Sequence, residues 1–241
     1  MNVVEMLQHE AGQFGVSLSD VQIQQFRRYY DEMSYWNSRV NLTRITGWEE
    51  VQQRHFVDSL TVGVALPNEV LRLGGKVLDV GSGAGLPGLP LKIAYPRLQV
   101  TLLESKAKKT AFLKHVARVL ELEGLEVLTG RAEDLAHQPT LREAYDVVVS
   151  RAVAKVRILV ELCLPFCRVG ALTIAQKTLT VGDEVKVAGN AIREVGGQLR
   201  EVIEVGTKGS GERRTLVLIE KTVPTSQKYP RRAGMPAKSP L

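Results

Sequence analysis

Five short β-type apolar runs alternate with helical stretches between residues 76 and 176, and this alternation constrains the fold more than any other feature. The runs are KVLDV, LQVTLL, LEVLT, YDVVVS and GALTIAQ. Strands separated by helices form parallel sheets, because right-handed crossovers return the chain to the same edge. Two further runs, QLREVIEV and RRTLVLIE, flank the glycine-rich TKGSGE and predict a hairpin. We therefore expect an α/β fold with a mostly parallel seven-stranded sheet and an antiparallel last strand.

Helical periodicity dominates the first 70 residues and predicts a helical N-terminal extension. Between residues 19 and 36, apolar side chains recur every three or four positions and form one stripe: Ile23, Phe26, Tyr30 and Met33. A second helical stretch covers residues 49–66. The tail is rich in proline, serine and basic residues, so we expect it to be extended, without a core of its own. The predicted parts are a helical segment (1–70), a core (71–223) and a basic tail (224–241).

Positive charge is concentrated near the C-terminus. The chain has a formal net charge of +6, and residues 206–241 hold eight basic side chains against two acidic ones. A basic segment beside a neutral body favours a polyanionic partner.

Composition also bears on compartment and on metal binding. The two cysteines, Cys163 and Cys167, have helical spacing, which predicts buried small side chains on one apolar face and no metal site. No apolar stretch approaches the length of a membrane span, and the acid-containing N-terminus does not resemble a targeting peptide. We expect a cytoplasmic protein with no membrane partner and no metal.

The glycine-rich stretch LDVGSGAGLPG, residues 78–88, directly follows the first β-type run. Glycines there let a ligand approach the backbone closely, although a tight strand-to-helix turn would need them too. A P-loop is excluded because no lysine follows the glycines, and Leu86 breaks the dinucleotide fingerprint. The remaining spacing resembles the first motif of class I S-adenosylmethionine-dependent methyltransferases, which have a Rossmann-like fold. The residues of this motif are Asp79, Gly81, Gly83 and Gly85.

Further candidate site residues end the next three strands. Glu104 ends the second run, where a carboxylate can accept both ribose hydroxyls and can also cap the following helix. Ala132 and Glu133 follow the third run, and Ser150 and Arg151 end the fourth. The carboxyl ends of parallel strands share one edge of the sheet, so these positions together favour an adenosyl ligand.

Seven segments carry a resemblance to one family. They are NLT (41–43), RHFVDSL (54–60), DVGSGAGLPGLPLKIAYP (79–96), LLESKAKKTAFL (102–113), GRAEDL (130–135), SRAVA (150–154) and KYPRRAGMPAKSPL (228–241). Together they resemble the bacterial small-subunit ribosomal RNA methyltransferase G family, also called glucose-inhibited division protein B. The resemblance implies methyl transfer from S-adenosyl-L-methionine to N7 of one guanosine near the decoding centre of 16S rRNA. It also implies 16S rRNA or the small ribosomal subunit as partner, and we expect a monomer.

The resemblance assigns roles to the strand-end residues. Gly81 and Leu86 are expected at the methionine part of the cofactor, and Arg151 is expected to close the site on the substrate side. The residues expected around the ribose are Glu104, Ser105 and Lys106, and those expected around the adenine are Ala132 and Glu133. Many relatives have aspartate where this chain has Glu104, and the longer carboxylate can still reach a diol.

Guanine N7 has an in-plane lone pair and no proton, so it can attack a sulfonium methyl without a general base. The protein then mainly has to orient the reactants. We expect Arg151 to share this substrate side with three residues of the helical segment, for which packing or local capping is an equal alternative: Asn41, His55 and Asp58. The residues expected to contact RNA are Lys177, Arg213, Arg214, Tyr229, Arg231 and Arg232.

Three other functions are compatible with parts of the sequence. A NAD-dependent oxidoreductase shares the sheet and the ribose acid, but Leu86 and the predicted antiparallel strand weigh against it. Intact Asp79 and Glu104 weigh against a catalytically inactive RNA-binding module. The basic C-terminal segment weighs against a methyltransferase that acts on a protein or a small molecule.

Overall fold

Seven strands form a single sheet in the order β3-β2-β1-β4-β5-β7-β6. The computed structural model describes residues 3–206 and 213–241. The strands are β1 (Lys76–Val80), β2 (Gln99–Glu104), β3 (Leu125–Thr129), β4 (Tyr145–Arg151), β5 (Cys167–Thr178), β6 (Gly197–Gly206) and β7 (Arg213–Lys221). The strands β1 to β5 pair in parallel, and β7 lies antiparallel between β5 and β6. The predicted mostly parallel sheet with an antiparallel last strand is confirmed. The segment TKGSGE (207–212), expected to join the hairpin, lies outside the described residues.

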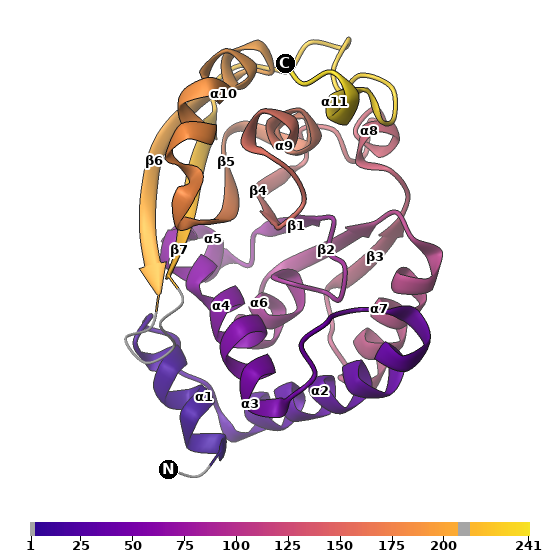
Figure 1. Cartoon of the computed structure of the whole chain (residues 1–241), viewed down its shortest axis with the longest axis vertical. Helices are drawn as coiled ribbons and strands as arrows, with labels where there is room; N and C mark the ends of the chain where they lie inside the picture. The colour runs from indigo at the N-terminus through magenta and orange to yellow at the C-terminus, as the bar shows by residue number, and fades with distance from the viewer. Residues whose placement is uncertain (1–2, 207–212) are drawn as a thin grey trace.

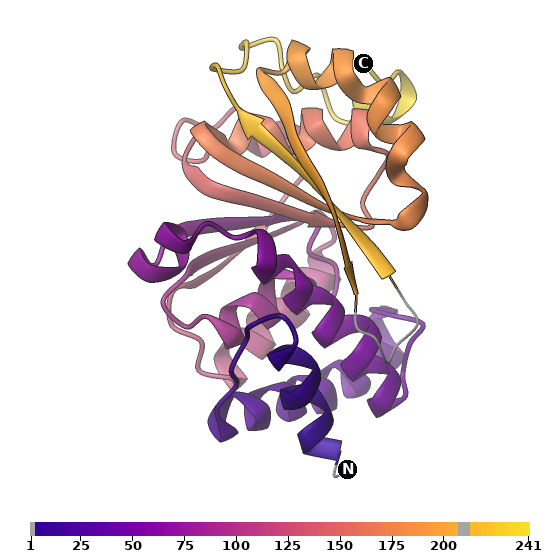
Figure 2. The ribbon, with the colours of Figure 1, turned by 90° about the vertical axis from the view of Figure 1, so that its left-hand side faces the viewer.

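Helices cover both faces of the sheet, as Figure 1 shows. They are α1 (Val3–Gly12), α2 (Asp20–Val40), α3 (Trp48–Val51), α4 (Asp58–Leu60), α5 (Asn68–Leu73), α6 (Gly88–Ala94), α7 (Ala107–Val119), α8 (Ala132–Leu135), α9 (Val156–Cys163), α10 (Gly182–Glu194) and α11 (Met235–Lys238). The helices α1 to α7 pack on one face, and α8 to α11 lie on the other (Figure 2). None of the helices in the described ranges is long and apolar enough to cross a membrane.

Side chains of β1 point alternately to the two faces of the sheet, so this strand contributes to two hydrophobic cores. Val77 packs in the core shared with the N-terminal helices, whereas Leu78 and Val80 pack in the core beneath α9 and α10. Successive side chains of a strand point to opposite faces, and a strand covered on both sides is apolar on both.

The long helix α2 starts at a capping box. The Ser19 hydroxyl accepts from the Gln22 backbone, and the Gln22 side chain accepts from the Ser19 backbone. Its buried stripe contains Tyr29, which is fully buried, where the periodicity predicts Tyr30. Tyr30 is half-buried and donates to the Thr46 carbonyl. A step of 3.6 residues places either tyrosine near the stripe, and packing on the glycine-rich stretch selects Tyr29.

The second predicted helix, residues 49–66, is divided into short pieces. Between α3 and α4 the chain forms a wide π-helical turn, η1 (Gln52–Val57), and a 3-10 turn, η2 (Thr61–Ala65), follows. The Asp58 N–H donates to the Gln53 carbonyl, while the Arg54 carbonyl accepts from the Arg151 side chain at 2.7 Å. An α-helix would join Asp58 N–H to that Arg54 carbonyl, so the inserted guanidinium accounts for the wide turn.

The tail differs from the extended segment expected from its composition. It folds against α8 and α9 (Figure 1), ends in the short helix α11, and buries Tyr229. The cysteines also differ in part. Both are buried, but Cys163 ends α9 and Cys167 begins β5, so they do not share a helical face. A 3-10 turn containing Pro165 separates them, because proline breaks the helical ladder.

Candidate cofactor and substrate site

The glycine-rich stretch forms the turn between β1 and α6, at the carboxyl edge of the sheet. Gly81 and Gly85 have φ values of +75° and +97°, which L side chains rarely adopt. A Cβ atom at Gly85 would lie 2.3 Å from Leu89 Cδ1, and one at Gly81 would lie 2.7 Å from Val153 Cγ2. The glycines are therefore needed both for the backbone conformation and for the close packing behind it.

Asp79 lies fully buried behind this turn. Its Oδ2 accepts from the Gly88 N–H at 2.9 Å, and its backbone carbonyl accepts from the Ser82 hydroxyl. Burial raises the pKa of Asp79 to about 7, although the Gly88 hydrogen bond acts in the opposite direction. The other carboxylate oxygen, Oδ1, is buried and has no hydrogen-bond partner among the residues described. A buried carboxylate of this kind fits a cofactor that brings positive charge.

Glu104 joins the second strand end to the glycine turn. One carboxylate oxygen accepts from the Gly83 N–H at 3.1 Å, and the other accepts from the Lys106 N–H at 2.8 Å. The Ser105 hydroxyl lies 3.3 Å from the same carboxylate. This geometry is compatible with both expected roles of Glu104, helix capping and ribose binding. Its carboxylate accepts from the backbone N–H that precedes α7, and it lies beside the glycine turn. Ser105 and Lys106 are exposed there.

Tyr29 is a site residue that the sequence did not reveal. Its hydroxyl donates to the Ala84 carbonyl inside the glycine turn at 2.5 Å, in a fully buried contact. Burial raises the pKa of Tyr29 far above its usual range, so the group remains a donor. In the sequence, Tyr29 is one aromatic residue of an amphipathic helix, and no pattern separates it from core residues.

The third strand end leads into α8, where Ala132 and Glu133 are both buried. The Glu133 carboxylate accepts from the Gly234 N–H at 2.9 Å, so it points toward the C-terminal tail. Arg131 lies 3.9 Å from the same carboxylate oxygen.

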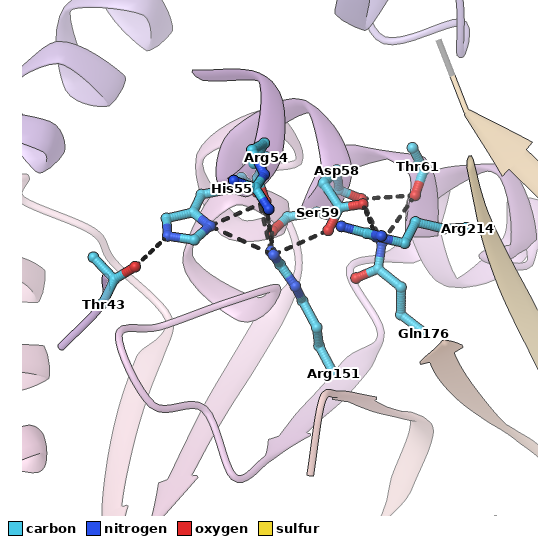
Figure 3. A network of polar contacts seen from close by, with 9 residues as sticks. All are labelled: Thr43, Arg54, His55, Asp58, Ser59, Thr61, Arg151, Gln176 and Arg214. Atoms are coloured by element: carbon cyan, nitrogen blue, oxygen red, sulfur yellow. Dashed lines mark hydrogen bonds and ion pairs between the residues drawn. The ribbon is translucent and has the colours of Figure 1, made fainter. Parts of the chain in front are cut away.

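Arg151, at the end of β4, reaches into the turn between α3 and α4 (Figure 3). Besides its bond to Arg54, its guanidinium lies 3.1 Å from Asp58 Oδ2 and 3.4 Å from both the Ser59 hydroxyl and the His55 carbonyl. Burial lowers the pKa of Arg151, while the Asp58 carboxylate raises it. Arg151 thus fastens the helical segment to the sheet.

His55 is buried and neutral near pH 7. Its Nδ1 lies 3.0 Å from the Arg54 carbonyl, and its Nε2 lies 2.7 Å from the Thr43 hydroxyl. The Arg54 carbonyl can only accept, so the proton of the neutral imidazole lies on Nδ1, and Nε2 accepts from the Thr43 hydroxyl. Burial and the nearby Arg151 charge lower the pKa of His55 to about 4. Thr43 is a second residue that sequence reasoning missed, although it belongs to the NLT motif.

Asp58 lies between two arginines (Figure 3). Its Oδ1 accepts from Arg214 Nε at 2.9 Å, and its Oδ2 faces Arg151. The Asp58 carbonyl accepts from the Gln176 amide at 2.6 Å, and Gln176 also contacts Thr61. The carboxylate therefore connects β4, β7 and the helical segment.

Asn41 does not join this network in the described contacts. It is exposed at the C-terminal end of α2 with φ 53°, and its N–H donates to the Asn37 carbonyl. Asparagine tolerates this left-handed conformation, so the geometry supports helix capping for Asn41.

The residues expected at RNA lie in different environments. Lys177 forms an ion pair with Glu184 at 2.8 Å and donates to the Ala154 carbonyl, with 12% of its side chain exposed. Tyr229 is buried with its hydroxyl 3.0 Å from Glu194, so its ring does not stack on a base in this conformation. Arg231 is bonded to Glu161. Arg213 and Arg232 are exposed and Arg214 is partly so, which leaves these three as accessible cations.

In the part of the chain that the structure describes, no group of three or more potential metal ligands lies together. The polar groups that lie at the carboxyl edge suit an organic ligand: backbone N–H groups, carboxylates and a buried arginine.

Comparisons with known proteins agree with this architecture. A family model described as rRNA small subunit methyltransferase G, GidB, matches residues 22–217. A protein named Ribosomal RNA small subunit methyltransferase G from Dehalococcoides mccartyi is 47% identical over 227 residues, which cover 94% of this chain and 95% of the relative. One of the same name from Roseiflexus castenholzii is 48% identical over 231 residues, covering 96% and 97%.

Two solved structures share the fold at low identity. The crystal structure of an MtNAS mutant in complex with S-adenosylmethionine superposes with a TM-score of 0.54 at 16% identity, covering 91% of this chain and 78% of that one. M. jannaschii TYW2 in complex with AdoMet superposes with a TM-score of 0.50 at 14% identity, covering 62% and 70%. At these identities the likeness concerns the fold alone.

Proposed function

The chain belongs to the rRNA small subunit methyltransferase G family, and from this membership we propose that it transfers a methyl group from S-adenosyl-L-methionine to N7 of one guanosine in 16S rRNA. The observation that supports the cofactor most strongly is the buried Asp79 carboxylate behind a backbone that only glycines can form. A cation bound at the turn would stabilise the ionised form of Asp79.

The residues that hold the cofactor lie along one edge of the sheet. The glycine turn with Leu86 would hold the methionine part, and the strand end of β2 would lie beside the ribose. Ala132 and Glu133 at the start of α8 would lie near the adenine. The residues that make up this site are Asp79, Gly81, Gly83, Gly85, Leu86, Glu104, Ser105, Lys106, Ala132, Glu133 and Arg151.

The cofactor supplies a sulfonium methyl group that a lone pair can attack directly. Guanine N7 carries no proton, so this chain needs no general base, and the neutral His55 is compatible with that requirement. The task of the protein is to orient the guanine and to exclude water. The Arg151–Asp58 pair lies on the side where the helical segment meets the sheet, and we assign it to the wall of the guanine pocket.

We assign RNA contact to the accessible cations at the start of β7. Arg214 keeps about a fifth of its side chain exposed while it bonds Asp58. Arg213, the preceding residue, is exposed toward the other face of the sheet, where it pairs with Glu204. The partner is 16S rRNA or the small ribosomal subunit, and the protein acts as a monomer in the cytoplasm. The helical segment 1–70 and the core 71–223 together form the pocket, and the tail 224–241 packs on the core.

A methylation map of 16S rRNA tests this function. Purified protein with labelled S-adenosyl-L-methionine should transfer label to naked 16S rRNA or to small subunits, and digestion should release labelled 7-methylguanosine. Cells without the gene should lose one 7-methylguanosine from their 16S rRNA. An unchanged map, or label recovered at another atom, would overturn the assignment.

A further inference from the structure

We propose that the C-terminal tail, through residues 229–234, is a positioning element of the cofactor's adenine subsite and not an RNA-binding arm. The proposal rests on the proposed function, which places the adenine near Ala132 and Glu133. Its basis is a set of buried polar contacts that join the tail to α8 and α9 on the face opposite the N-terminal helices.

The first contact is an ion pair between Arg231 and Glu161. Glu161 lies on α9 and is fully buried. Its Oε1 accepts from the Arg231 backbone N–H and from Nε, both at 2.8 Å, and its Oε2 accepts from Nη2 at 2.6 Å. A buried carboxylate with three donors from one residue fixes both the backbone and the side chain of that residue. Arg231, which keeps about a quarter of its side chain exposed, is thus held to the protein by both its backbone and its guanidinium.

The second contact joins the tail to the loop that follows α8. The Arg142 guanidinium donates to the carbonyls of Tyr229, Thr225 and Ser226, and also to that of Ala136 just after α8. His137 Nε2 lies 2.8 Å from the Pro230 carbonyl. Side chains of the loop after α8 therefore form hydrogen bonds with the backbone carbonyls of the tail.

The third contact reaches the candidate subsite itself. The Gly234 N–H donates to Glu133 Oε1 at 2.9 Å, at a point where Gly234 has φ +84°. The helix α8 has four residues, too few for internal hydrogen bonds to hold it in place. The tail supplies two external contacts, one to Glu133 within α8 and one to His137 just after it.

These contacts have a functional consequence for the proposed reaction. If the tail sets the position of α8, loosening Arg231 should weaken cofactor binding while leaving the attack geometry at the glycine turn intact. We therefore expect a higher KM for S-adenosyl-L-methionine with little change in kcat, and unchanged affinity for RNA.

The test compares three variants of the full chain. Arg231→Lys keeps the charge but loses the forked contact with Glu161. The double variant Glu161→Gln with Arg231→Gln removes both charges, so no buried charge is left without its partner if the single variant fails to fold. Lys238→Ala removes an exposed tail cation and is the matched control. Calorimetric titration with S-adenosyl-L-methionine, thermal melting and 16S rRNA binding are measured for each.

The expected result is a roughly tenfold weaker cofactor affinity in Arg231→Lys and in the double variant, with Lys238→Ala unchanged. Cofactor affinity equal to that of the unmodified protein, with or without a lower melting temperature, would overturn the proposal. A loss of RNA affinity with unchanged cofactor affinity would also overturn the proposal, because it would indicate that the tail binds RNA. Failure of the unmodified protein to bind S-adenosyl-L-methionine would instead contradict the proposed function.

Discussion

The hydroxyl of Tyr29 donates a hydrogen bond to the carbonyl of Ala84, and this contact ties a helix of the N-terminal segment directly to the glycine turn. The two residues are separated by 55 positions in the chain. The turn is therefore supported from the helical layer as well as from the strand that precedes it.

Replacing Tyr29 with phenylalanine should weaken binding of S-adenosyl-L-methionine. The Ala84 carbonyl would remain buried without its donor, which costs about 1–3 kcal/mol. Part of that cost falls on the conformation of the turn, so we expect a fivefold to tenfold loss of affinity by calorimetry. Tyr30→Phe is the matched control, because Tyr30 bonds the Thr46 carbonyl at the surface. Equal affinity in both variants would show that Tyr29 only fills space.

Replacing Arg151 with alanine should strongly destabilise the fold. The change removes the donor to the Arg54 carbonyl and one cationic partner of the buried Asp58. Breaking a buried pair in this way typically costs about 3–5 kcal/mol. Urea denaturation measures the loss, and Arg168→Ala is the control because about half of the Arg168 side chain is exposed where it pairs with Asp146. A change of about 1 kcal/mol or less, the value typical of surface pairs, would contradict a fastening role for Arg151.

Cofactor affinity should increase with pH up to about pH 7. The folded-state pKa of Asp79 is raised to about 7 from 3.8, so below pH 7 the carboxyl is mostly protonated in the free protein. A cationic ligand favours the ionised form, and binding then releases a proton. Titrations at pH 5.5, 6.5 and 7.5 should show up to a tenfold gain per unit below the pKa. Asp79→Asn should remove the slope, and a slope retained by this variant would assign it to another group.

The raised pKa of Asp79 also makes the stability of the fold depend on pH. Since its folded-state pKa is raised, Asp79 stabilises the fold fully below pH 3.8, and this contribution is lost as pH rises through about 7. Thermal melting of the cofactor-free protein should therefore rise less between pH 7.5 and 5.5 in Asp79→Asn than in the unmodified protein. Parallel melting curves across that range would argue against an ionised Asp79 at pH 7.5.

His55 should remain uncharged throughout the range from pH 5 to pH 8. Its folded-state pKa is lowered to about 4 from 6.5, so its contribution to stability is present above pH 6.5 and lost as pH falls through about 4. A proton NMR titration of the imidazole, assigned with His55→Gln, should show no midpoint between pH 5 and 8. A midpoint near 6.5 would mean that the contacts with Thr43 and Arg54 do not persist in solution.

The topology and the glycine turn could be predicted because they depend on local patterns. Apolar runs of strand length, helical periodicity and the G-x-G-x-G spacing are each readable within about twenty residues. The predicted set also contains Arg151 and Asp58, which the structure joins. Asn41 was grouped with them because it belongs to NLT, but in the structure Thr43 of the same motif reaches His55.

What could not be predicted depends on contacts between distant segments. Tyr29 has the same periodicity as ordinary core residues, and only packing against Ala84 distinguishes it. The tail has the composition of an extended segment, yet buried partners on other elements hold it. Glu161 looks like a surface acid on a helix until the fold places Arg231 beside it. Composition reports average preferences, and a few strong buried contacts override them.

The carboxylate shared by Arg151 and Arg214 also has a consequence for the order in which the molecule is made. Arg214 follows Asp58 by 156 residues in the chain. During synthesis, the Asp58 carboxylate can therefore pair with Arg214 only after nearly the whole chain has been made. The helical segment can therefore reach its final environment only after the last strand inserts between β5 and β6. Fragments that end before β7 should be less stable than the complete chain, because they lack Arg214, the second partner of Asp58 in the helical segment.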